Sequence, residues 1–229
     1  MTSKRSTCKR GNHALQFSLN RFASLLGCLG LFSLGVFAQS APSHRAELPP
    51  LLPVDKEVAL ARSAAPEYIS SRATIYILKR GGFIKHIEGS NGFTCLVPRE
   101  GTKGIAPMCF DPEGSQTILL GELRLAELLE HGKSMAEAMK EVDEGYAKGT
   151  FKAPRRSGVA YMLSTENHLN DPDSGQTFDY PPHLMIYAPY AQNSDIGASA
   201  AQRGSTEVPW ILHEGKPYAY IIVVPGAKK

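Results

Sequence analysis

The chain has 229 residues, of which 42% are hydrophobic and 21% are charged, as is typical of a globular protein. This composition excludes a disordered tail protein, a collagen-like fibre and a polytopic membrane protein. Residues 1–38 hold five of the 25 basic side chains and no acidic one, so 20 basic and 22 acidic side chains remain for the rest of the chain. A nearly neutral body gives no electrostatic reason to expect a nucleic-acid partner.

Residues 1–38 have the layout of a secretory signal peptide. A basic segment ending at Arg21 precedes the uncharged apolar run Phe22–Ala38, and Val36 and Ala38 suit the two small-residue positions before a cleavage site. The alternative is a retained membrane anchor, because this run is near the shortest length that spans a bilayer. The sequence therefore predicts a secreted or periplasmic protein, with no membrane contact beyond a possible uncleaved anchor.

After the signal, residues 39–53 are rich in Pro, Ser and Ala and predict a flexible linker. Residues 54–229 predict one domain, which is long enough to bury a full core. At its start, Asp55 is placed to cap a short helix over Lys56–Ala65, which Pro66 ends.

Three short strands follow at Thr74–Leu78, Phe83–Glu88 and Phe93–Val97. Each is rich in β-branched and aromatic residues, and glycine-containing turns separate them. The pattern predicts an antiparallel meander.

Leucines recur at helical spacing over Gln116–Glu130, and Gly132 follows as a C-cap. Ser134 and Glu137 form a capping box that opens a second helix, which Gly149 ends. The two helices predict an α-helical hairpin.

Four further strands are expected at Gly158–Leu163, Leu184–Tyr187, Pro209–His213 and Tyr218–Val224. The order predicts an α+β fold, in which an antiparallel sheet of about six to seven strands is covered on one face by the helical hairpin and the short N-terminal helix. Helices between two groups of strands also make this order similar to that of PAS-like and GAF-like sensor domains. Two long loops, 166–182 and 193–208, are of a length that is often functional.

Cys95 and Cys109 are the two cysteines that remain after the signal. In an exported chain they predict one disulfide that closes the loop between them. The alternative is two separate buried thiols. Their spacing does not support a thioredoxin-like role.

The segment Pro181–Tyr190 holds the first candidate ligand-binding residues. In an extended strand His183, Met185 and Tyr187 share one face, and Tyr190 follows shortly after. A histidine beside tyrosines could line a pocket or act as a base, but such residues also pack at sheet edges with their polar atoms satisfied locally. Arg155 and Arg156 could bind a carboxylate or phosphate, or lie solvated in a loop.

Asp171 and Asp173 lie in a Pro- and Gly-containing segment that partly matches a calcium loop. The remaining ligand positions of that motif are missing, so an ordinary turn is favoured over a metal site. Motifs for zinc hydrolysis, a nucleophilic serine elbow and phosphate binding are also missing. The sequence thus predicts neither a cofactor nor a catalytic residue, and leaves open whether the chain is an enzyme.

Three strings, Asn91–Val97, Pro107–Asp111 and Pro182–Tyr190, resemble an uncharacterised family of exported bacterial proteins with no assigned activity. The resemblance covers most of the mature chain. It implies export and a shared fold, and it implies no mechanism.

Three hypotheses about function follow, and the first is favoured. The chain is a small-molecule or peptide binding or sensor-like domain, whose open sheet face carries His183, Met185 and Tyr187. Alternatively it is a hydrolase or isomerase that uses His183 with a loop carboxylate, Asp171 or Asp173. The third hypothesis is an envelope-associated structural protein whose arm, residues 39–53, contacts a partner.

Overall fold

A computed structural model of the chain describes residues 50–100, 103–170 and 177–226. The predicted signal peptide and most of the predicted linker lie outside these residues. No helix in the described ranges is long and apolar enough to cross a membrane. The fold is α+β, as predicted.

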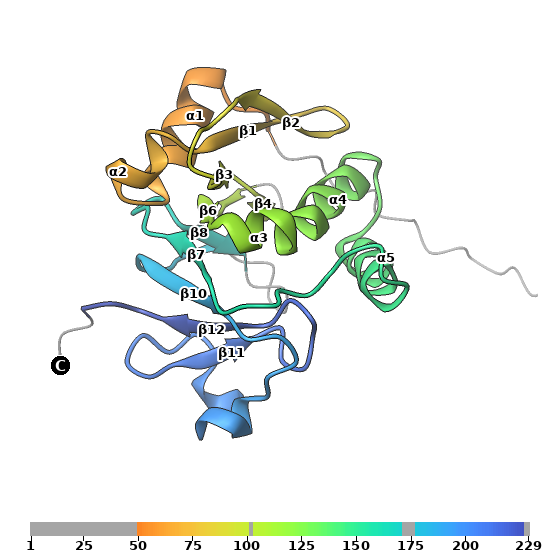
Figure 1. Ribbon diagram of the computed structural model, residues 1–229, viewed down its shortest axis with the longest axis vertical. Coiled ribbons are helices and arrows are strands. Elements are labelled where there is room, and N and C mark those ends of the chain that lie inside the picture. Colours follow the sequence, from red (N-terminus) through yellow and green to blue (C-terminus); the bar gives the residue numbers. More distant parts are fainter. Residues whose placement is uncertain (1–49, 101–102, 171–176, 227–229) are drawn as a thin grey trace, which may run out of the picture. The chain divides into compact units, whose positions relative to one another are not determined.

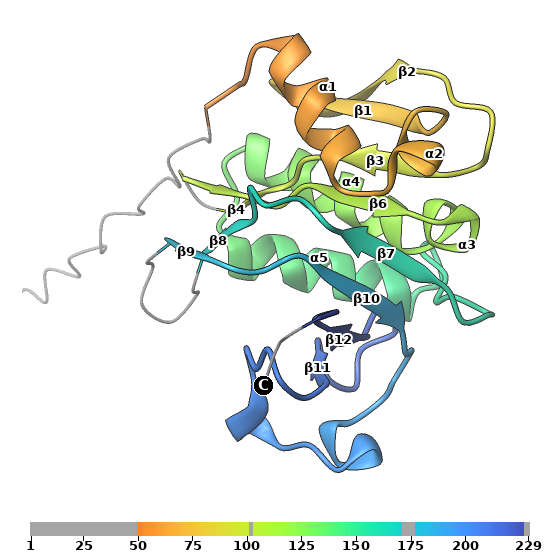
Figure 2. The ribbon, with the colours of Figure 1, turned by 90° about the vertical axis from the view of Figure 1, so that its left-hand side faces the viewer.

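A mixed sheet of eight strands forms the centre of the domain, in the order β11-β12-β10-β7-β6-β3-β1-β2. Figure 2 shows these strands stacked one below the other, from β2 down to β11. Their bounds are Thr74–Lys79 (β1), Gly82–Ile87 (β2), Thr94–Leu96 (β3), Met108–Phe110 (β6), Val159–Met162 (β7), His183–Tyr187 (β10), Trp210–Leu212 (β11) and Tyr220–Val223 (β12).

A second, four-stranded sheet is built from short segments in the order β4-β5-β8-β9. These strands span Arg99–Glu100, Gly104–Ile105, His168–Asn170 and Thr177–Asp179. Two of them lie in the predicted 166–182 loop, whose residues 171–176 are outside the described part of the chain.

The predicted meander is wrong at its third strand. β1 and β2 form an antiparallel hairpin, but β3 pairs in parallel with β1 on the other side. The connecting segment wraps around the start of β1, where Gly89 N–H donates to Thr74 Oγ1 at 3.0 Å and Ser90 N–H donates to Arg72 O at 2.8 Å. A Cβ on Gly89 would lie 2.2 Å from Thr74 N, so only glycine fits at this crossing.

Helices cover both faces of the sheet, and the expectation of a single covered face is therefore wrong. Figure 1 shows α1 and α2 on one side and α3, α4 and α5 on the other. The helices span Val54–Ser63 (α1), Glu67–Ser70 (α2), Pro112–Gln116 (α3), Ile118–Glu130 (α4) and Met135–Ala147 (α5). Two 3₁₀ turns, Asn193–Ile196 and Ala200–Gln202, lie in the second long loop.

The alternation of β1 explains the two covered faces. Ile75 and Ile77 pack in the core under α1, whereas Tyr76 points toward the main core under α4. A strand that is apolar on both faces requires cover on both. The sequence pattern predicted the strand, but it did not predict on which face of the sheet each helix lies.

The helix predictions are largely confirmed. Ser134 and Glu137 form the capping box that opens α5, and Gly132 after α4 has a positive φ of 84°. The first helix begins earlier than expected, directly after Pro53, and Asp55 makes no capping hydrogen bond.

The predicted disulfide is confirmed between Cys95 of β3 and Cys109 of β6, which face each other in the antiparallel register. Both residues are fully buried in the core under α1. Next to them, Glu57 of α1 and Arg99 form a buried ion pair at 2.8 Å, and Glu57 also accepts a hydrogen bond from Leu78 N–H at 2.8 Å. These two links fix α1 and the β4–β5 hairpin to the sheet.

Candidate functional site

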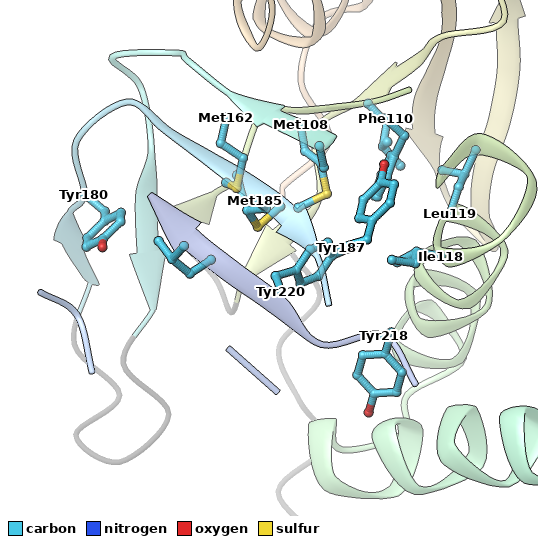
Figure 3. Close-up of a cluster of buried hydrophobic side chains, with 14 of the residues drawn as sticks. Met108, Phe110, Ile118, Leu119, Met162, Tyr180, Met185, Tyr187, Tyr218 and Tyr220 are labelled. Atoms are coloured by element: carbon cyan, nitrogen blue, oxygen red, sulfur yellow. The ribbon is translucent and has the colours of Figure 1, made fainter. Parts of the chain in front are cut away.

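The predicted face of β10 lies in the core and not on an open surface. His183, Met185 and Tyr187 do share one face, but their exposed fractions are only 2%, 2% and 3%. Figure 3 shows Met185 and Tyr187 among side chains from neighbouring strands and from α4. The placement of a ligand on this face is therefore corrected: these residues form the packed centre under α4 and α5.

His183 is held by groups that leave it little freedom for proton transfer. Its Nδ1 lies 2.9 Å from the carbonyl oxygen of Pro181, and its ring packs edge-on against Tyr180 at 4.9 Å between centroids. Burial lowers the pKa of His183 below its usual value. The carboxylates proposed to assist it, Asp171 and Asp173, lie outside the described residues.

The hydroxyl of Tyr187 contacts a carboxylate that also accepts hydrogen bonds from two backbone N–H groups. Its hydroxyl donates to Asp111 Oδ1 at 3.1 Å, and Asp111 also accepts from Gly114 N–H at 2.8 Å and Val159 N–H at 3.0 Å. Burial, followed by the negative charge of Asp111, raises the pKa of Tyr187 well above its usual value. The tyrosine stays protonated and serves as a hydrogen-bond donor that ties β10 to the start of α3.

Glycine is required on both sides of this contact. A Cβ on Gly114 would lie 1.9 Å from the Tyr187 hydroxyl, and one on Gly158 would lie 2.3 Å from Asp111 Oδ2. The backbone at these two glycines therefore packs directly against the side chains of Tyr187 and Asp111.

Arg155 and Arg156 bind a carboxylate of the same chain. The backbone N–H of Arg155 donates to Glu113 Oε1 at 2.8 Å, and Arg156 Nε donates to Glu113 Oε2 at 3.2 Å. These contacts, with the backbone hydrogen bond first, lower the pKa of Glu113. Arg156 is nevertheless 77% exposed, so most of its guanidinium surface faces solvent.

The last predicted residue, Tyr190, is also accessible, with an exposed fraction of 62%. Its φ of 65° is unusual for a tyrosine, and its N–H donates to Lys216 O at 2.8 Å. Arg155, Arg156 and Tyr187 meet through the two carboxylates at the start of α3. His183 lies at the opposite end of β10, so the candidates do not form one site.

A second polar cluster was not predicted. Asp143 of α5 accepts from the Tyr218 hydroxyl and from Lys216 Nζ, both at 2.7 Å, and His213 packs edge-on against Tyr218. Burial lowers the pKa of His213 to about 4, although Asp143 opposes that shift. More than 70 residues separate Asp143 from its partners, and no spacing in the sequence signals such a contact.

No group of three or more His, Cys, Asp or Glu side chains in the described ranges is arranged to hold a metal ion. His168 Nδ1 lies 2.7 Å from Asp179 Oδ1 across the β8–β9 pair, and this contact raises the pKa of His168. The arrangement is a surface ion pair that closes the hairpin.

Two shallow hollows lie on the surface. One, of about 360 Å³, is at the corner between α1 and α2 and is lined by Arg62, Ser63, Ala65, Glu67, Ser70 and Ser71. The other, of about 390 Å³, lies between the start of β2, one stripe of α4 and the segment after α5. We call it the α4 groove; it is lined by Gly81, Gly82, Phe83, Leu120, Leu123, Arg124, Glu127, Thr150 and Phe151.

The lining of the α4 groove combines four apolar side chains with polar groups, and its two charged residues are paired. Leu120 is 42% exposed, which is high for a leucine beside other apolar side chains. Arg124 pairs with Glu127 at 2.9 Å and also with Glu141. The groove therefore offers a partly apolar contact surface that the sequence did not predict, because Leu123 was assigned to the helical pattern and Leu120 was not singled out.

Comparison with protein-family models, with curated proteins and with solved structures finds no match for this chain. The predicted resemblance to exported bacterial proteins accordingly stays a prediction.

Proposed function

We propose that this chain is an exported binding module and that the α4 groove is its ligand site. Export is supported by the predicted signal peptide and by the Cys95–Cys109 disulfide, because disulfides persist in oxidising compartments. The sequence reasoning favoured a binding domain, and the proposal keeps that function but moves its site from β10 to α4.

One observation carries the proposal: an open hollow beside an edge strand, in which the exposed Leu120 meets half-buried aromatic side chains. Phe83, Leu120 and Phe151 come from three separate segments and line the same hollow. Apolar walls with a few polar groups at the rim are typical of small-ligand and peptide sites. The hollow is shallow, so it suits one or two apolar side chains and not an enclosed metabolite.

The titratable candidates favour binding over catalysis. Within the described ranges Asp111, Glu113 and Asp143 are each engaged by two or more donors of the same chain, and His183 bonds a backbone carbonyl. A general base needs access to a substrate proton. These groups instead connect strands to helices.

Methyl NMR of the uniformly labelled protein tests the proposal. The probes are N-acetyl amides of leucine, phenylalanine and methionine, added singly at millimolar concentration. We expect the methyl signals of Leu120 and Leu123 to shift in a saturable way, and the Leu120→Glu variant to abolish this response.

The matched control is Met135→Glu, since Met135 is an equally exposed apolar residue (43%) on the neighbouring helix. It should leave the response unchanged. Shifts that survive Leu120→Glu, or that are lost equally in both variants, would place binding outside the groove and contradict the proposal.

A further inference from the structure

The α4 groove lies beside a free edge of the large sheet. β2 is the terminal strand of the order, and within the part of the chain that the structure describes it pairs with β1 only. Ile84, Lys85 and His86, in the middle of β2, are all exposed. In an antiparallel ladder alternate backbone N–H and C=O groups point away from the partner strand, so β2 presents unused hydrogen-bonding groups at this edge.

The groove and the edge strand share two residues, Gly82 and Phe83. Phe83 belongs to β2 and also lines the groove with Leu120 and Leu123 of α4. A strand added next to β2 would turn every second side chain toward the face that α4 covers. Side chains on that face would then meet the apolar walls of the groove.

The charges at the rim favour a partner that carries a carboxylate. Glu127 is paired with Arg124, and Glu130 accepts two hydrogen bonds from Arg80 at 3.0 and 3.1 Å. Lys152, which follows Phe151 of the groove in the chain, is exposed and has no ion-pair partner within the described ranges, and its Nζ lies near Gly149. A cation without a partner beside neutralised acids is complementary to a negative charge.

A second copy of the chain is a poorer occupant of this edge. Antiparallel pairing of β2 with itself would bring like charges of Lys85 close together, and charged residues on an edge strand oppose self-association. Lys85 already pairs with Glu88 of its own chain at 2.8 Å.

We propose that the α4 groove takes an extended peptide, which adds as a strand to β2, places an apolar side chain between Phe83 and Leu120, and pairs a carboxylate with Lys152. This inference rests on the proposed function and specifies the class of its ligand. Strand addition of this kind draws affinity from main-chain hydrogen bonds and specificity from alternate side chains.

Calorimetric titration with synthetic hexapeptides tests this peptide-binding proposal. The probe is acetylated and amidated, has leucine at its second position, glutamate at its fourth and threonine elsewhere. A second peptide has glutamine in place of glutamate, and a third carries N-methyl groups on alternate amides. We expect the glutamine peptide to bind about three-fold more weakly, as for an exposed ion pair, and the N-methyl peptide at least about ten-fold more weakly.

Lys152→Gln should remove the difference between the glutamate and glutamine peptides, while Lys56→Gln, at an exposed lysine on α1, should preserve it. Equal affinity of the N-methyl peptide would overturn strand addition, and a glutamate preference that survives Lys152→Gln would overturn the charge assignment. If the N-acetyl amides shift the groove methyls but the hexapeptide does not bind, the peptide inference is wrong and the groove remains a ligand site.

Discussion

The two halves of the eight-stranded sheet are stabilised in different ways. The half formed by β2, β1, β3 and β6 is covered by α1 on one face and by α4 on the other, and holds the disulfide and the buried Glu57–Arg99 pair. The half formed by β7, β10, β12 and β11 packs tyrosines under α4 and α5 and uses their hydroxyls to reach carboxylates on helices.

This difference predicts which substitutions the fold tolerates. The first half depends on links that are fully removed from water, so losing one partner leaves a buried group uncompensated. The second half uses buried tyrosine hydroxyls on carboxylates that keep other donors, so the loss of one hydroxyl leaves no charge unpaired. The α4 groove lies on the first half, at the start of β2.

The largest effect is expected from Glu57→Gln. The substitution removes the charge that compensates Arg99, whose pKa is already lowered by burial. Breaking a buried ion pair costs about 3–5 kcal/mol of unfolding free energy. Urea denaturation of the purified protein measures this loss of unfolding free energy.

The control is Glu88→Gln, which removes an exposed ion pair on the same half and should change stability by no more than about 0.5 kcal/mol. Equal costs for the two variants would contradict the claim that burial distinguishes them.

Replacing both cysteines of the disulfide ranks next. The Cys95→Ala/Cys109→Ala variant should lose about 3 kcal/mol in the chain-entropy model, because the bridge spans 14 residues. Chemical denaturation measures the loss. A stability equal to that of the parent protein would show that strand pairing alone holds β3 against β6.

Acid should destabilise the second half through His213. The pKa of this histidine is lowered to about 4 in the folded protein, chiefly by burial, with Arg203 and Lys216 adding to the shift and Asp143 opposing it. The unfolded chain takes up the proton first, so stability is complete above pH 6.5 and falls as the pH drops toward 4. The loss amounts to about 2–3 kcal/mol.

His213→Asn isolates this contribution, because asparagine tolerates the positive φ of 57° at this position. Denaturation curves between pH 7 and pH 4 should be flatter for the variant. An unchanged pH dependence would assign the acid sensitivity to other groups, such as His183, whose pKa is also lowered.

The smallest expected effect is that of Tyr187→Phe, at about 1 kcal/mol. Asp111 keeps its two backbone donors in the variant, so the carboxylate is not left unpaired. Thermal unfolding measures the loss of stability in the Tyr187→Phe variant. A loss of stability as large as that of Glu57→Gln would contradict the claim that the two halves of the sheet are stabilised in different ways.

The sequence predicted the structural features that depend on the local spacing of residue types. The α4–α5 hairpin, the capping box at Ser134, most strands and the disulfide follow from periodicity, turn residues and cysteine count. The parallel pairing of β3 with β1 could not be predicted, because it depends on a crossing where Gly89 touches the backbone of Thr74.

The candidate site was less predictable for a similar reason. His183, Met185 and Tyr187 do share a face, as the strand period requires, but the period does not say whether that face is covered. The α4 groove joins a β-turn, a helix stripe and a loop from distant parts of the chain. Only the tertiary arrangement brings these three segments together.

A crystal structure of the protein soaked with the glutamate-containing hexapeptide tests the central claim most directly. The account predicts electron density for a strand paired with β2, with the leucine side chain between Phe83 and Leu120. Peptide density at another surface, with the α4 groove accessible in the crystal and empty, would contradict it.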